Sequence, residues 1–134
     1  MKLSLASVLL VLLAAGCAAP GPPPPPPKPV VTPDTVDGLY RGTSTRYQAD
    51  SRSCPSPGLV TLHVLGGQFT YRWNARIQVP ASIQSDGTVQ GQSDDIMLTG
   101  QVSLPAPGAP VPLRIEGDVT NGICGIHYTV TKRG

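Results

Sequence analysis

The feature that most constrains the fold of this chain is an alternation of apolar and polar residues with a period of two, which recurs from residue 38 to the end. In residues 60–64, three aliphatic residues alternate with a threonine and a histidine, and in residues 69–73 three aromatic residues alternate with a threonine and an arginine. No stretch of about ten residues or more has apolar side chains at helical spacing. Because successive side chains of a β-strand point to opposite faces, this pattern predicts an all-β domain.

Turn signals divide the alternating region into eight expected strands. Gly66-Gly67, Asp86-Gly87 and Asn121-Gly122 are tight-turn pairs that predict hairpins between the strands before and after them. A loop with four prolines interrupts the pattern at 104–112. The expected strands cover residues 38–47, 58–65, 68–74, 76–84, 87–92, 95–103, 112–120 and 123–132.

Eight short strands joined mostly by tight turns are what an up-and-down barrel requires, and closure removes the exposed edges of a small sheet. We therefore expect residues 37–134 to form a small antiparallel eight-stranded up-and-down barrel. In such a barrel the first strand lies beside both the second and the eighth. A β-sandwich of the same strands is the alternative, because alternation does not show whether a sheet closes.

The N-terminal residues have the pattern of a signal peptide. Lys2 gives a basic start, an apolar run extends from Leu3 to Leu13, and small residues follow up to Gly16. The run is shorter than the roughly 20 apolar residues that a membrane-spanning helix needs. Residues 1–16 are therefore expected to be removed during export.

The segment Leu12-Leu13-Ala14-Ala15-Gly16-Cys17 resembles the lipobox of bacterial lipoproteins, although many lipoboxes have leucine where this chain has Ala14. The resemblance implies that Cys17 becomes the first mature residue and carries acyl chains such as palmitate, which anchor the protein to a membrane. The non-acidic Ala18 implies that this is the outer membrane. Ordinary cleavage after Ala19 is the alternative and would give a secreted or periplasmic protein.

Residues 17–36 connect the expected anchor to the expected domain and are rich in proline. The run from Ala18 to Pro33 cannot form a helix or a central strand and is typical of polyproline II. At about 3.1 Å per residue it would reach on the order of 50 Å. We therefore expect a semi-rigid spacer; a ligand for an aromatic groove of the SH3 or WW kind is the alternative.

The three cysteines suggest one disulfide. Once Cys17 is assigned to lipid, Cys54 and Cys124 remain as a pair. Cys54 follows the first expected strand and Cys124 begins the eighth, so both lie at one end of neighbouring strands in the barrel. A structural Cys54–Cys124 disulfide is expected rather than a redox pair, because catalytic dithiols are usually local CxxC motifs.

Charge and motif content exclude several function classes. Charged residues are 13% of the chain, against about 25% in a typical globular protein. The basic residues are scattered among acidic ones, which argues against a nucleic-acid partner. His63 and His127 are separated by the first strand in the barrel, so neither a metal nor another cofactor is expected. No nucleophile motif surrounds Ser51 and Ser53, and we expect no enzyme.

The candidate binding residues lie on one rim of the expected barrel. Alternate strand ends place residues 50–54 and the turn 73–76 on the rim that carries the disulfide, and loops on a rigid scaffold commonly hold binding residues. Arg52, Trp73 and Arg76 are therefore candidate contact residues. Trp73 would serve as an aromatic anchor or, alternatively, would only plug the barrel end.

Three functions stay open at this point. The leading expectation is an envelope lipoprotein that presents its β domain to an unidentified envelope protein or other component. The second is a carrier of a small apolar ligand inside the barrel, since Gly38-x-Tyr40-x-Gly42 is similar to the opening of lipocalin-type domains. The third is a protease inhibitor. A cavity of a few hundred cubic ångströms would favour the carrier.

Overall fold

The computed structural model describes residues 16–134, and the expected signal peptide (1–16) lies outside the described residues except for Gly16. From residue 16 to residue 30 the chain is exposed and has no helix or strand. No helix within 16–134 has the length and apolar character needed to cross a membrane.

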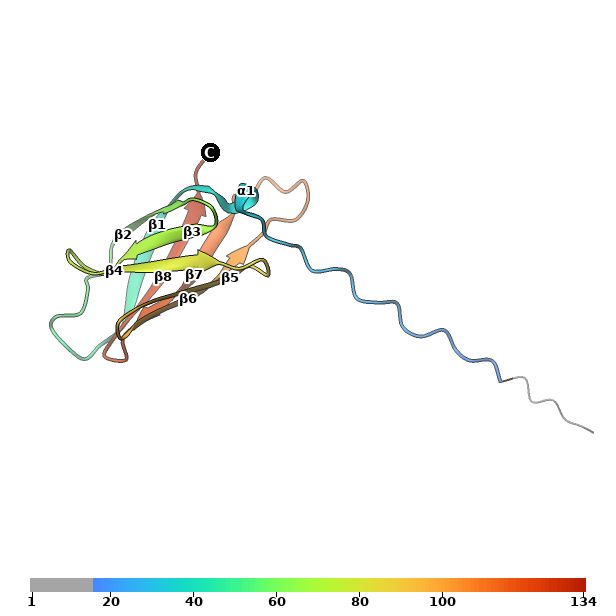
Figure 1. The fold of residues 1–134 in the computed structure, drawn as a ribbon, viewed down its shortest axis with the longest axis horizontal. Helices are drawn as coiled ribbons and strands as arrows, with labels where there is room; N and C mark the ends of the chain where they lie inside the picture. Colours follow the sequence, from blue (N-terminus) through green and yellow to red (C-terminus); the bar gives the residue numbers. More distant parts are fainter. Residues whose placement is uncertain (1–15) are drawn as a thin grey trace, which may run out of the picture.

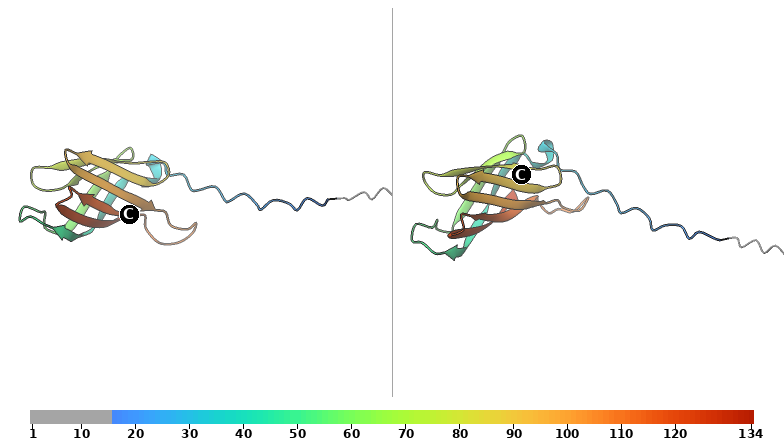
Figure 2. Two further views of the ribbon diagram at one scale, coloured as in Figure 1. Left: turned by 90° about the horizontal axis from the view of Figure 1, so that it is seen from below. Right: turned by 60° about the horizontal axis from the view of Figure 1, so that its bottom comes forward.

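The folded part is one antiparallel sheet of eight strands that curls into a nearly closed barrel (Figures 1 and 2). Each strand boundary lies within two residues of the expected one, and the all-β barrel is confirmed. Because all strands belong to one sheet, the two-sheet sandwich is excluded. The strands are β1 (Gly38–Ala49), β2 (Leu59–Val64), β3 (Gln68–Arg72), β4 (Gln78–Ile83), β5 (Thr88–Ser93), β6 (Ile96–Ser103), β7 (Arg114–Thr120) and β8 (Cys124–Lys132).

The strand order in the sheet is β2-β1-β8-β7-β6-β5-β4-β3. As expected, β1 lies between β2 and β8. The prediction that β2 and β3 form a hairpin is wrong beyond the turn. The only bridge found between the two segments is Leu65–Gln68, and the strands themselves are not paired. Alternation indicates which side chains point inward but does not indicate which strands exchange hydrogen bonds.

The inward side chains form one contiguous core. Tyr40 and Tyr128 are the largest fully buried side chains, and the three aromatic residues of the 69–73 segment are 5–6% exposed. These aromatic residues are therefore core residues and not an exposed stacking platform. The side chains below 2% exposure include Leu62, Leu98, Ile115, Ile126, Val79, Val89, Val119 and Val130.

A short helix, α1 (Pro33–Val36), covers the barrel end from which the tail leaves (Figure 1). Val36 is fully buried, and its carbonyl accepts a 2.7 Å hydrogen bond from the Tyr40 hydroxyl. The Val31 N–H donates to the Ser85 carbonyl at 2.8 Å. Val31 and α1, which precede residue 37, therefore also pack against the barrel.

Alkaline pH is expected to destabilise the domain through Tyr40. Burial, together with the negative charge of Asp37, raises the pKa of Tyr40 from 10.0 to about 12. The folded state therefore holds the phenolic proton more tightly than the unfolded chain does. The resulting stability is complete below pH 10 and is lost as the pH rises toward about 12.

The free energy of unfolding measured from pH 9 upward should therefore fall across this window, and Tyr40→Phe should make the fall smaller. The same fall in the variant and the wild type would show that Tyr40 titrates normally in the folded protein.

Candidate functional site

The barrel end opposite the tail carries the disulfide and the loop between β1 and β2 (Figure 1). The expected Cys54–Cys124 bond is confirmed, and it joins Cα atoms 5.3 Å apart. Because Cys124 begins β8, the bond ties the 50–58 loop to the strand next to β1. We call this end the disulfide rim.

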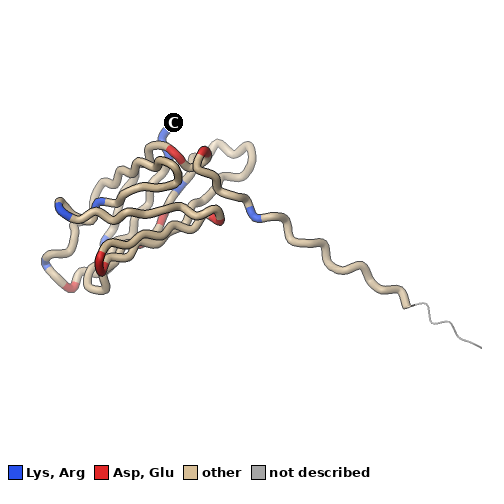
Figure 3. The backbone as a smooth tube through the Cα atoms, in the orientation of Figure 1, with Lys and Arg blue, Asp and Glu red and all other residues tan. Residues whose placement is uncertain are grey.

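The structure places the three expected contact residues at the disulfide rim in different environments. Arg52 is exposed in the 50–58 loop, and Arg76 is exposed in the turn between β3 and β4, whose tip is coloured as basic in Figure 3. Trp73 is 6% exposed and belongs to the core. The two arginines are therefore free to contact a partner, whereas Trp73 occupies the position expected for a plug of the barrel end.

The gap in the sheet between β2 and β3 is the main irregularity of the barrel, and we call it the seam. At one end of the seam, Leu65 and Gln68 exchange two backbone hydrogen bonds of 2.9 and 3.1 Å. Beyond this bridge β2 pairs only with β1, and β3 pairs only with β4. The sheet is therefore nearly but not fully closed.

Asp37 fixes the closed end of the seam. Its carboxylate accepts hydrogen bonds from the N–H groups of Gly66, at 2.8 Å, and Gly67, at 2.9 Å. The bond from Gly67 and then that from Gly66 lower the pKa of Asp37. Both glycines have positive φ angles, 61° and 71°, which a tight two-residue hairpin turn requires.

The edge of β2 turns unpaired backbone groups toward the seam. In an antiparallel pair, alternate residues direct their N–H and C=O groups to the same neighbouring strand. The Ser44 N–H donates to the Gly58 carbonyl at 2.8 Å, so the even-numbered residues of β2 bond to β1. The N–H and C=O groups of Thr61 and His63 therefore face the seam.

The edge of β3 does the same from the other side. The Trp73 N–H donates to the Ile77 carbonyl at 3.0 Å, so the odd-numbered residues of β3 bond to β4. The backbone N–H and C=O groups of the even-numbered residues therefore face the seam. The side chains of these residues are exposed. Among the residues whose unpaired backbone groups face the gap, we call four the seam residues: Thr61, His63, Thr70 and Arg72.

A hollow of about 320 Å³ lies at the seam toward the disulfide rim. The buried rings of Tyr71 and Trp73 line it from β3, and Arg72 lies between them. The centroid of the Tyr71 ring is 5.5 Å from that of Tyr128, so this wall is continuous with the core. The remaining lining residues are Ser44, Pro55, Ser56, Gly58, Leu59, Val60, Thr61 and Ile126.

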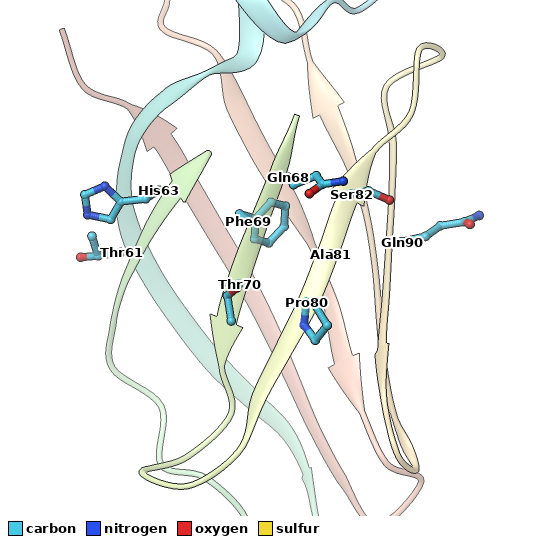
Figure 4. A pocket seen from close by; sticks show the side chains of 9 residues that line it. All are labelled: Thr61, His63, Gln68, Phe69, Thr70, Pro80, Ala81, Ser82 and Gln90. Atoms are coloured by element: carbon cyan, nitrogen blue, oxygen red, sulfur yellow. The ribbon is translucent and has the colours of Figure 1, made fainter. Parts of the chain in front are cut away.

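A second hollow, of about 600 Å³, lies on the outer face near the closed end of the seam (Figure 4). In Figure 4, Thr61 and His63 lie on one side of the seam and Thr70 and Pro80 on the other. The outer hollow shares Thr61 with the hollow at the disulfide rim. The two hollows therefore adjoin the same unpaired edge of β2.

Comparisons with models of protein families, with curated proteins and with solved structures found no match. Among residues 16–134, no group of three or more His, Cys, Asp or Glu side chains could hold a metal ion. The side chain of His127 pairs with Asp118 at 2.9 Å, and His63 stands apart on β2 beyond β1.

The seam was not predicted from the sequence, and Pro80 does not mark it, because its missing N–H lies on the β5 side of β4. A proline within a strand removes one ladder hydrogen bond. The Gln84 N–H donates to the Thr88 carbonyl, so the even-numbered residues of β4 face β5, and pairing between these strands ends at Ala81. The β3–β4 hairpin beyond Pro80 is therefore not bonded to β5.

Proposed function

We propose that this protein is an envelope lipoprotein, anchored through lipid on Cys17 at the outer membrane, whose β domain binds another envelope component. The observation that carries the proposal is the placement of the tail at the barrel end opposite the disulfide rim (Figures 1 and 2). An anchored tail would hold the disulfide rim and the adjoining part of the seam away from the membrane.

The filled interior favours surface binding over carriage of a small apolar ligand. A carrier needs an enclosed cavity of a few hundred cubic ångströms. In the described barrel the inward side chains pack into one core, and the 320 Å³ hollow lies at the seam. Binding to a protease would be one form of surface binding, and no feature of the site singles it out.

Lipid on Cys17 is tested by labelling growing cells with a fatty-acid analogue. Cys17 is exposed and is not part of the disulfide, so Cys17→Ser should leave the fold unchanged. We expect the wild type to carry the label and to sediment with outer membranes, and the variant to be unlabelled and released. Equal labelling of the two would contradict the proposal.

Binding through the disulfide rim is tested by a photo-crosslinking residue at position 76. Position 106, in the loop between β6 and β7 at the tail end, is the matched control because Ala106 and Arg76 are both exposed and neither has a positive φ angle. We expect crosslinks to one envelope component from position 76 and none from position 106. Arg52→Ala with Arg76→Ala should reduce the crosslink and leave the melting temperature nearly unchanged. The reverse pattern of crosslinks would assign binding to the tail end.

A further inference from the structure

We infer that the seam binds an extended polypeptide strand with acidic side chains, which adds to the sheet between β2 and β3. The inference rests on the proposed function and names the surface and the chemical class of the partner. It is carried by the unpaired backbone groups, the charge around the seam and the hollow beside it.

The unpaired backbone groups of the seam residues supply the general part of the recognition. A free sheet edge is a template for another strand, and many domains bind extended peptides in this way. Here two free edges face each other across one gap. A strand that enters at the disulfide rim and pairs with either edge would therefore meet donors and acceptors that no neighbouring strand uses.

The charge around the seam supplies the specificity. Strands β1 to β4 contain Arg41, Arg46 and Arg72 and no Asp or Glu. Residues 37–83, which include Asp37 at the closed end of the seam, hold five arginines and two acidic residues, whereas residues 84–134 hold five acidic and three basic residues. Because complementary charge steers association, the seam side of the barrel favours an acidic strand.

The hollow determines how such a strand would be oriented. Side chains of a strand point alternately to the two faces of its sheet. In the seam, one set would point outward, where Arg72 is exposed, and the other set would point inward to the hollow lined by Tyr71 and Trp73. The preferred ligand is therefore a segment in which acidic and apolar residues alternate.

The tip of the β3–β4 hairpin is not paired with β5, so the width of the seam can change at that end. Because Pro80 has no N–H group and pairing with β5 ends at Ala81, the tip of this hairpin can move without breaking bonds to β5. The proline-rich tail of this chain cannot occupy the seam itself, because its prolines lack the N–H groups that strand pairing needs. The occupant is therefore a segment of another polypeptide.

The test uses the chain from residue 17 with Cys17→Ser, and a synthetic peptide of about nine residues in which glutamate alternates with valine. The control peptide has lysine in place of glutamate. We expect the glutamate peptide to shift the amide NMR signals of the seam residues and to slow their hydrogen exchange. Its affinity should exceed that of the lysine peptide by at least about tenfold, and Arg72→Glu should reverse this preference.

A backbone variant tests strand addition separately from charge. Thr61→Pro removes a seam-facing N–H and keeps the β1–β2 bonds, which the even-numbered residues make. Thr61→Val keeps the N–H and is the matched control. We expect the proline variant to bind the glutamate peptide at least about tenfold more weakly, and the valine variant to bind it normally. If circular dichroism shows that Thr61→Pro does not fold, the Arg72→Glu result decides.

Three results would overturn the inference. The first is an absence of shifts at the seam residues at millimolar peptide, and the second is equal affinity for the two peptides. The third is binding to phosphatidylglycerol vesicles in place of the peptide. If position 76 crosslinks to an envelope component and any of these three results is also obtained, the proposed function is kept and strand binding at the seam is rejected. If the peptide binds at the seam but fatty-acid labelling of the wild type at Cys17 fails, only the lipoprotein proposal is contradicted.

Discussion

Replacing Cys54 and Cys124 together by serine is expected to lower the free energy of unfolding by about 4 kcal/mol. The bond joins residues 70 apart in the sequence, so it closes a loop that contains β2 to β7. Cross-linking so long a segment removes much of the conformational freedom of the unfolded chain. Urea denaturation of the serine variant and of the wild type measures the difference.

Reduction of the wild type should give the same loss, because it opens the same loop without changing the sequence. Cys17→Ser is the matched control and should leave the urea midpoint unchanged, since Cys17 is exposed in the tail. A loss below about 1 kcal/mol would mean that the loop is constrained in the unfolded state by something other than the bond.

Gly117→Ala is expected to destabilise the domain by about 3 kcal/mol or more. Gly117 pairs with Gly100 on β6 and with Tyr128 on β8. A Cβ atom at this position would overlap the backbone oxygen of Thr99, which cannot move without shifting β6. Thermal unfolding of the variant should therefore begin at a much lower temperature than that of the wild type.

Gly58→Ala is the control for this substitution. A Cβ atom there meets nothing within 4 Å, and its φ angle lies outside the left-handed region. We expect a change of less than about 0.5 kcal/mol. Similar losses for the two substitutions would show that close approach of β6 and β7 is not what requires glycine at position 117.

The strands and the disulfide could be predicted because each depends on a short-range or topological rule. Alternation identifies the inward face of every strand, and paired turn residues such as Asp86-Gly87 mark most strand ends. The neighbouring positions of β1 and β8 then bring Cys54 and Cys124 together.

The seam and the tail-end cap could not be predicted in the same way. Thr61 and Thr70 would alternate with buried residues whether or not β2 and β3 exchanged hydrogen bonds, so the pattern is identical for an open and a closed barrel. Val31 and Val36 flank Pro33 in a segment too short to show a period. Their burial depends on tertiary contacts at the barrel end.

Within the candidate site, the exposed positions of Arg52 and Arg76 agree with the assignment of alternate strand ends to one rim. Trp73 shows the limit of that reasoning. Its place at the end of β3 was clear from the sequence, but whether its ring pointed to solvent or to the core depended on packing with neighbours such as Tyr71. Only the structure shows that both rings line the hollow at the seam.

Amide hydrogen exchange of the free protein tests the open seam most directly. Backbone groups that lack a partner exchange quickly, whereas those bonded to a neighbouring strand exchange slowly. We expect slow exchange at Val60, Leu62, Phe69 and Tyr71, which bond to β1 or β4. The seam residues should exchange quickly: Thr61, His63, Thr70 and Arg72. Slow exchange at all eight amides in the free protein would mean that β2 and β3 pair along their length, and it would contradict a seam open to a partner strand.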